Sequence, residues 1–170
     1  MIILIGYMGS GKSTIGRVLS KSLQKKYYDL DHFIEKKENS SISKIFQSKG
    51  EIYFRRRERE LLQELLIENE DIILSLGGGT PCFGDTMEII KNATPNVFYL
   101  KLSVQALTER LKHEKGTRPL ISHLETDEAL EEFIRKHIFE RNFYYLQAHK
   151  SINADHKSAE VLAQEIMELL

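Results

Sequence analysis

The sequence predicts an α/β fold, a three-layer α/β/α P-loop domain with a five-stranded parallel sheet and a mobile lid. Two observations lead to this class. Short apolar, strand-forming runs alternate along the chain with stretches of helical periodicity, and glycine-rich or acidic segments follow the first three strands. With 170 residues, of which 41% are hydrophobic, the chain is long enough to bury one substantial core. We therefore expect a single domain over residues 1–170.

The first strand, at residues 1–5, leads into a segment at residues 6–14 that contains the pattern G-x-x-x-x-G-K-[ST]. Residues 13–25 follow with helical periodicity, which is the context that this motif requires. Its glycines permit positive φ, so backbone N–H groups and the helix start can converge on an anion. Lys12 would reach the β- and γ-phosphates, and Ser13 would bind magnesium. The motif predicts a nucleoside triphosphate site; the alternative is a glycine-rich turn beside a surface lysine.

The other elements follow from periodicity and from the residues that mark their ends. Ser41 and Ser43 are expected to cap a short helix, Gly50 separates it from a long one, and three consecutive glycines end the third strand. We expect strands at residues 1–5, 27–31, 71–76, 96–102 and 151–153. We expect helices at residues 13–25, about 41–46, 51–69, 86–92, 103–112, 127–148 and 158–170.

Residues 114–125 differ in composition from the segments around them. Gly116, Pro119 and His123 interrupt any periodicity, and we expect a mobile lid over about residues 112–126. Arg118 in this lid would close over the phosphates and bring a cation to the transferring group. A generic exposed arginine is the alternative interpretation.

The ends of the first three strands carry the residues expected to form a site. Because ligands of parallel α/β sheets bind at the carboxyl ends of the strands, Gly11, Asp29, Asp31 and Gly77 should share one crevice. Asp29 and Asp31 alternate along the second strand, so both should lie on the same side of it. One could face the water shell of a magnesium ion while the other reaches an acceptor hydroxyl. For Asp31 the competing interpretation is a cap on a helix that begins at His32.

A buried charge is predicted in the long helix at residues 51–69. Glu58 lies on its apolar stripe, where an unpaired carboxylate would be costly, and Arg55 is the natural partner three residues earlier. At a crevice, such a pair would form a site for an anionic acceptor. Arg56 and Arg57 are expected on the solvated face of the helix.

Two further features point to a second ligand. The three glycines at residues 77–79 are explained better by close approach of the backbone to a ligand than by a plain turn. Arg141 lies among apolar neighbours on its predicted helix, where capture of an anion competes with snorkelling to solvent.

Composition argues against several classes of function. Lys and Arg number 24 against 25 Asp and Glu, so no basic field favours nucleic acid. Cys82 is the single cysteine and cannot form an internal disulfide, and no apolar run approaches the length of a membrane span. The histidines show no metal-ligand spacing with Cys82, and no Asn-Lys-x-Asp segment for reading guanine occurs. We expect a cytoplasmic protein without nucleic-acid or membrane partners.

Together these residues resemble the shikimate kinase family, from Ile2 to nearly the C-terminus. In chain order the family shows a P-loop, an Asp-x-Asp after the second strand, a Phe-Arg-Arg-x-Glu segment, a strand ending in Gly-Gly-Gly, an Arg-Pro-Leu lid and a late arginine. Here these motifs are residues 6–14, 29–31, 54–58, 77–79, 118–120 and Arg141. Their order and sum separate the family from other P-loop small-molecule kinases.

The resemblance implies a kinase that phosphorylates the 3-hydroxyl of shikimate, with ATP as co-substrate and Mg²⁺ as cofactor. The residues it assigns to ATP are Gly9, Ser10, Gly11, Lys12, Ser13, Thr14, Arg110 and Arg118, with Arg110 against the adenine. Those it assigns to shikimate are Asp31, Arg55, Glu58, Gly77, Gly78, Gly79 and Arg141, and the substrate-binding helices are expected at about residues 31–69.

The same resemblance implies the roles within the site. Lys12, Asp31 and Arg118 are the catalytic candidates, with Asp31 as the base for the 3-hydroxyl or as the group that orients it. Ser13 would bind the metal directly, and Asp29 would bind it through water.

The sequence departs from the family pattern in two places. The interval from Arg110 to the lid arginine is one residue longer than usual, and Thr80-Pro81 replaces a more frequent small aliphatic residue. Tyr145 could line the acceptor pocket or belong to the core. Two rival functions stay open: a kinase of another polyhydroxy acid such as gluconate, which leaves the arginine pair unexplained, and a nucleotide-binding regulatory module. We expect a monomer.

Overall fold

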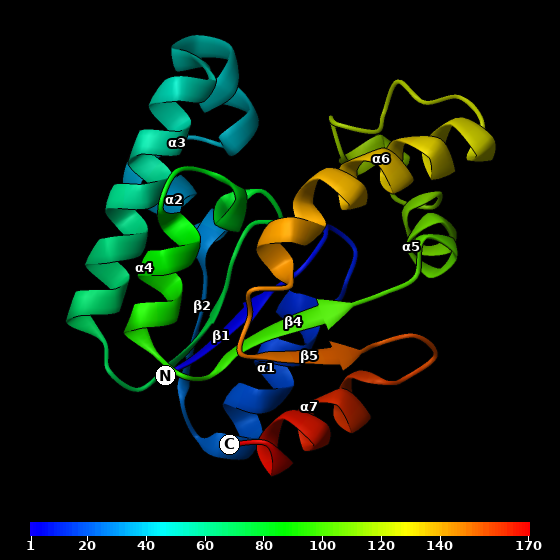
Figure 1. Ribbon diagram of the computed structural model, residues 1–170. Helices are drawn as coiled ribbons and strands as arrows, with labels where there is room; N and C mark the ends of the chain where they lie inside the picture. Colours follow the sequence, from blue (N-terminus) through cyan, green and yellow to red (C-terminus); the bar gives the residue numbers. More distant parts are fainter.

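Five parallel strands form the centre of the molecule, in the order β2-β3-β1-β4-β5 (Figure 1). The computed structural model covers residues 1–170 and describes every side chain except that of Thr117. The strands are β1 (Ile2–Ile5), β2 (Lys26–Asp29), β3 (Ile72–Ser75), β4 (Val97–Lys101) and β5 (Lys150–Asn153). The helices are α1 (Lys12–Leu23), α2 (Leu30–Glu38), α3 (Ile42–Glu68), α4 (Thr86–Ala93), α5 (Val104–Leu111), α6 (Asp127–Tyr145) and α7 (Ala159–Glu168), with 3-10 helices η1 (Thr80–Cys82) and η2 (Lys115–Thr117).

The central strand β1 is buried on both faces. Its four residues, Ile2 to Ile5, are each at most 1% exposed, as expected for a parallel strand covered by helices on both sides. α1 and α7 lie together on one side of the sheet, and α3 and α4 lie beside each other on the other side (Figure 1). The predicted three-layer fold is confirmed. None of the helices formed by the described residues has both the length and the apolar character needed to cross a membrane.

The register of the sheet brings three strand ends to one edge. Asp29 at the end of β2 pairs with Ser75 at the end of β3, and Ser75 pairs with Leu4 near the end of β1. The glycine-rich loop that follows β1 and the glycines that follow β3 therefore emerge beside Asp29.

The second strand ends earlier than predicted. β2 ends at Asp29 and α2 begins at Leu30, so Asp31 lies in the first turn of a helix and not on a strand. The argument from strand alternation was therefore wrong. The capping interpretation of Asp31 was also wrong, because Asp29 is the N-cap and accepts a hydrogen bond from the backbone N–H of His32 at 3.4 Å.

The two helices predicted around Gly50 form one run, α3, which is interrupted where Gly50 adopts φ 78° and ψ 172°. Ser41 is its N-cap as predicted, whereas Ser43 lies inside the helix. Arg57 is not merely solvated, because its Nε donates to Oε1 of Glu38 at 2.7 Å and ties α3 to α2. The other predicted elements end within three residues of their observed bounds.

The packing of α1 on β2 yields a prediction about stability. A methyl group on Gly16 would overlap the ring of Tyr27. Gly16→Ala should lower the free energy of unfolding by about 1–3 kcal/mol, the usual cost of overpacking, in spite of the better helix propensity of alanine. Urea unfolding followed by circular dichroism measures this difference.

Gly116→Ala is the matched control for this substitution. A Cβ at Gly116 would meet no described atom within 4 Å, so the change in unfolding free energy should stay below about 0.5 kcal/mol. A Gly16→Ala variant as stable as this control would contradict the packing argument.

Candidate active site

The glycine-rich loop between β1 and α1 has the form of an anion site. Gly9 and Gly11 have φ of 76° and 90°, a region that side chains rarely adopt. α1 begins directly after them, so its first N–H groups point into the loop. The buried Lys12 ammonium donates hydrogen bonds to the carbonyl oxygens of Gly6 at 2.9 Å and Tyr7 at 2.8 Å. This loop can hold phosphate groups against a fixed cation.

Ser13 and Asp29 bring two oxygen atoms together beside the loop. The Ser13 hydroxyl donates to Oδ2 of Asp29 at 2.8 Å, and the Tyr27 hydroxyl donates to the same oxygen at 3.2 Å. A hydroxyl and a carboxylate are oxygen ligands of the kind that magnesium prefers. Among the described residues, no group of three or more His, Cys, Asp or Glu side chains could hold a metal. Phosphate oxygens and water would therefore have to complete the coordination.

Asp31 places a carboxylate against the glycines that follow β3. A Cβ on Gly77 would lie only 2.8 Å from its Oδ1. Burial, followed by the negative charges of Asp29 and Glu58, raises the pKa of Asp31 to about 6, while Lys12 opposes the shift. Burial in turn lowers the pKa of Lys12 to about 8. Two groups of opposite charge with perturbed pKa values in one place are typical of a catalytic site.

One crevice of about 260 Å³ brings these groups together. Its lining residues are Met8, Gly9, Gly11, Lys12, Ser13, Thr14, Asp29, Asp31, Leu76, Gly77, Gly78, Glu114 and Arg118. The predicted convergence of Gly11, Asp29, Asp31 and Gly77 is confirmed. The sequence did not assign Met8, Leu76 and Glu114 to the site, because their residue types do not indicate ligand binding. Only their positions beside the motifs could have suggested them.

Arg55 and Glu58 form the predicted buried pair on α3. Nη1 of Arg55 donates to Oε2 of Glu58 at 2.8 Å, and Glu58 is 3% exposed. The guanidinium lies 4.0 Å from the centroid of the Phe83 ring. A Cβ on Gly79 would lie 3.0 Å from Nη2 of Arg55. Arg55 is not among the residues that line the crevice, but it borders the glycine segment that forms the crevice wall.

The glycine segment, residues 77–79, is crowded by other parts of the protein. A Cβ on Gly78 would lie 3.2 Å from the backbone nitrogen of Met8, while Asp31 and Arg55 approach the glycines on either side of it. Protein groups therefore approach the glycine backbone closely, and the approach of a ligand stays a prediction. Because glycines have no side chain, the phosphate-binding loop, Asp31 and Arg55 can all pack against this segment.

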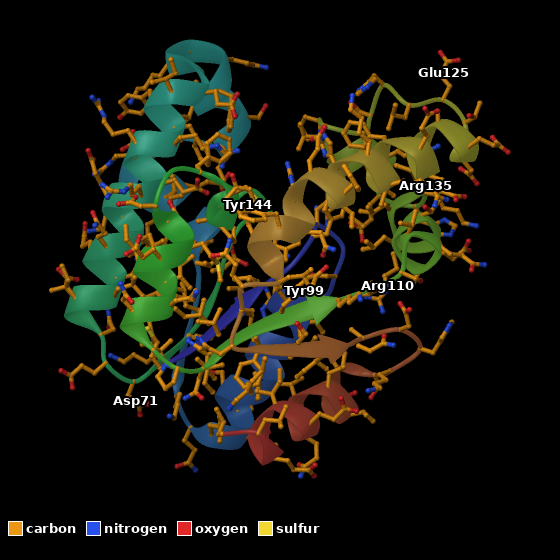
Figure 2. All side chains as sticks on the ribbon, in the orientation of Figure 1. Asp71, Tyr99, Arg110, Glu125, Arg135 and Tyr144 are labelled. Carbon is orange, nitrogen blue, oxygen red and sulfur yellow. The ribbon has the colours of Figure 1, made fainter. Side chains whose placement is uncertain are left out.

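Tyr145 on α6 belongs to the core and holds the backbone of the glycine segment. It is fully buried, and its ring centroid lies 5.0 Å from that of Tyr99 on β4, which is labelled in Figure 2. Its hydroxyl donates to the carbonyl oxygen of Gly78 at 2.6 Å. The core role left open by the sequence is confirmed, and Tyr145 is not among the residues that line the crevice; it contacts the backbone of the glycine segment that does.

Arg141, one turn before Tyr145 on α6, lies near the same segment. Its guanidinium is 5.6 Å from the centroid of the Tyr7 ring. Burial raises the pKa of the Cys82 thiol to about 11, and the positive charges of Arg141 and Arg55 both oppose this shift. The two arginines from α3 and α6 therefore act on the same short stretch after β3.

Two further arginines lie on the phosphate side. Arg118 lines the crevice from the lid, and its Nε pairs with Oε2 of Glu114 at 2.5 Å. Ile121, three residues later, is fully buried and anchors this segment. Arg110 belongs to the last turn of α5, and Figure 2 shows it near the tip of the β4 arrow; its Nη1 donates to the carbonyl oxygen of Gly9 at 3.3 Å.

Comparison with known proteins agrees with this geometry. A family model described as shikimate kinase matches residues 8–170. The shikimate kinase of Flavobacterium johnsoniae is 44% identical over 169 residues, which cover 99% of this chain and 98% of that protein.

Solved structures of shikimate kinases share the complete fold. The crystal structure of the enzyme from Bacteroides thetaiotaomicron has a TM-score of 0.91 at 34% identity and covers 99% of this chain and 96% of its own. The shikimate kinase from Acinetobacter baumannii, solved in complex with shikimate, has a TM-score of 0.87 at 36% identity and covers 99% of this chain and 90% of its own. From the matching family model and the identity over the full length, this chain belongs to the shikimate kinase family.

Proposed function

We propose that this protein transfers the γ-phosphoryl group of ATP to the 3-hydroxyl of shikimate, forming shikimate 3-phosphate on the route to chorismate and the aromatic amino acids. The observation that carries the proposal is that the phosphate-binding loop with Lys12 lines the same crevice as Asp31. Enzymes accelerate phosphoryl transfer mainly by positioning and by charge, so donor and acceptor groups must lie this close together.

On the donor side, the backbone N–H groups of residues 9–14 would hold the phosphates. Ser13 would bind a magnesium ion directly and Asp29 would bind it through water, in agreement with their 2.8 Å contact. Magnesium bound there would neutralise charge on the β- and γ-phosphate oxygens. Lys12 and Arg118 would balance the charge of the transferring group, and Arg110 would lie against the adenine.

On the acceptor side, two arginines would hold the carboxylate of shikimate. These are Arg55 from α3 and Arg141 from α6, and Glu58 would hold Arg55 in place. Asp31 would bind the ring hydroxyls, and the N–H groups of residues 77–79 would line the pocket. The helices at about residues 31–69 would be the substrate-binding part of the domain.

Asp31 would meet the attacking hydroxyl. Its pKa of about 6 leaves it mostly ionised at neutral pH, so it can accept the hydrogen bond of the 3-hydroxyl. With a loose transition state, orienting the hydroxyl contributes more than removing its proton early.

The rest of the proposal concerns the protein as a whole. Residues 112–126 would close as a lid over the phosphates and exclude water from the crevice. One chain supplies all the groups named above, so we propose a monomer that acts in the cytoplasm on two small-molecule substrates.

The direct test is ADP release by the purified protein in a coupled assay with ATP, magnesium and shikimate. We expect turnover that depends on shikimate, because Asp31 lines the same crevice as the phosphate-binding loop. ADP release that stays at the level without shikimate would refute the proposal.

The same assay separates the two rival functions. Turnover of gluconate in place of shikimate would indicate a kinase of another polyhydroxy acid. A regulatory module would bind ATP but have no second site, so calorimetry with shikimate in the presence of ADP would give no binding heat.

A second prediction separates the two halves of the site. Arg55→Ala should raise the KM for shikimate by about tenfold or more and leave the KM for ATP within about twofold, because it removes a partner of the acceptor carboxylate only. Steady-state kinetics with each substrate varied in turn provide the measurement. Lys12→Ala is the donor-side comparison and should depress kcat instead. Equal effects of Arg55→Ala on both KM values would contradict the assignment.

A third prediction concerns pH. The profile of kcat/KM for shikimate should rise as pH passes about 6, because Asp31 must lose its proton, and fall above about 8, where Lys12 loses its own. Burial raises the pKa of Asp31 and lowers that of Lys12, so the pH range in which both groups are charged is narrower than for free side chains. Initial rates between pH 5 and pH 9 test this.

Asp31→Asn is the control for the acidic limb. It should lower kcat by about a hundredfold and leave a residual rate that no longer rises through pH 6. An acidic limb that persists unchanged in this variant would assign that pKa to another group.

A further inference from the structure

Thr80 is the first residue after the three glycines and the first residue of η1. It is 1% exposed, and its hydroxyl donates a hydrogen bond to Oε1 of Glu58 at 2.6 Å. The other carboxylate oxygen of Glu58 accepts from Nη1 of Arg55 at 2.8 Å. A single buried carboxylate therefore joins a hydroxyl on η1 to a guanidinium on α3.

This carboxylate has little freedom once both partners are in place. Glu58 is 3% exposed, so an oxygen that lost its hydrogen bond could not turn to bulk water. The Thr80 hydroxyl satisfies one oxygen and so fixes the rotamer in which the other faces Arg55. Without the hydroxyl, the side chain of Glu58 would rotate to recover a partner, and the contact with Arg55 would loosen.

The guanidinium of Arg55 depends on this contact for its orientation. The group is planar, so one fixed N–H and one covered face define its plane. Glu58 fixes Nη1, and the ring of Phe83 covers one face at 4.0 Å. Nε of Arg55 is buried, has no hydrogen-bond partner among the described residues and lies 3.5 Å from Oε1 of the half-exposed Glu51 in an ion pair, so Glu58 is the close hydrogen-bonded anchor of the group.

Thr80 is also tied to the backbone of the glycine segment. Its N–H donates to the carbonyl oxygen of Gly77 at 3.1 Å, which closes the turn that carries Gly78 and Gly79. The hydroxyl is thus placed at a set position relative to the N–H groups of that turn. Thr80 therefore fixes the position of the glycine backbone directly and that of Arg55 through Glu58.

We propose that Thr80 is a positioning residue of the acceptor site, which acts through Glu58 to orient Arg55 toward the carboxylate of the acceptor. The proposal rests on the function proposed above for Arg55. Thr80 does not contact the substrate in this scheme. It sets the geometry of the group that does, in a way that a small aliphatic residue at the same position could not.

The test compares Thr80→Val, which keeps the shape and removes the hydroxyl, with Thr80→Ser, which keeps the hydroxyl. Thr80→Val should raise the KM for shikimate by about five- to tenfold and leave the KM for ATP within about twofold, as expected for an unsatisfied buried carboxylate beside the binding arginine. Thr80→Ser should restore the KM for shikimate to within about twofold of the unchanged protein. If Thr80→Val does not fold, Thr80→Ala also removes the hydroxyl and does so without an added methyl group.

Thr94→Val is a matched control from the opposite edge of the sheet. Thr94 is 6% exposed, and its hydroxyl donates to the carbonyl oxygen of Met1 at 2.9 Å and accepts from the backbone N–H of Asn96 at 3.2 Å, so the same change removes hydrogen bonds of a buried threonine far from the crevice. It should lower the melting temperature without changing either KM. A rise in the KM for shikimate in this control would show that lost stability alone explains the effect.

The double variant Arg55→Ala/Thr80→Val decides between action through Arg55 and a separate effect. If Thr80 acts through Arg55, adding Thr80→Val to Arg55→Ala should leave the KM for shikimate unchanged within about twofold. A full additional five- to tenfold rise would overturn the proposal, as would equal rises in both KM values for Thr80→Val alone. If Arg55→Ala itself has no effect on shikimate, the proposed acceptor site fails; if Arg55→Ala weakens shikimate binding and Thr80→Val is silent, only this inference fails.

Discussion

The parallel register of β1, β2 and β3 is the constraint on which the site depends. Asp29 pairs with Ser75 and Ser75 with Leu4, so the segments after these strands leave the sheet at one edge. Neighbouring strands lie about 4.8 Å apart, which places a phosphate loop, an acid and a glycine turn within reach of one substrate pair. The strands are held by buried aliphatic side chains, so the groups at their ends are positioned before any ligand binds.

Burying charged side chains at this edge of the sheet costs stability and shifts their pKa values. Lys12 and Asp31 are each driven toward their neutral forms by burial, and each partly protects the charge of the other. The resulting pKa values of about 8 and about 6 leave an interval around neutral pH in which both groups are ionised. A site of this kind gives up stability for a fixed arrangement of charge, as active sites commonly do.

The proposed acceptor side is organised by hydrogen bonds between elements and not by the sheet alone. Tyr145 on α6 holds the carbonyl oxygen of Gly78, and Thr80 holds Glu58 on α3. The short segment after β3 is thereby fastened to α3 and α6, the two helices that carry Arg55 and Arg141, which are proposed to hold the acceptor. Changes in this segment are expected to alter recognition of the acceptor while leaving the phosphate loop intact.

The sequence by itself determined the fold class, the order of the strands, the phosphate loop and the pairing of Glu58 with Arg55, because these follow from local spacing along the chain, whereas α2 was missing from the expected helices. It misplaced Asp31, because the end of β2 depends on Asp29 acting as a helix cap. Only the tertiary structure decided that Thr80 contacts Glu58 and that Tyr145 contacts Gly78. It also decided that other parts of the protein pack closely against the three glycines. These contacts join residues far apart in the chain, and their distances depend on how α3, α6 and the segment after β3 pack together.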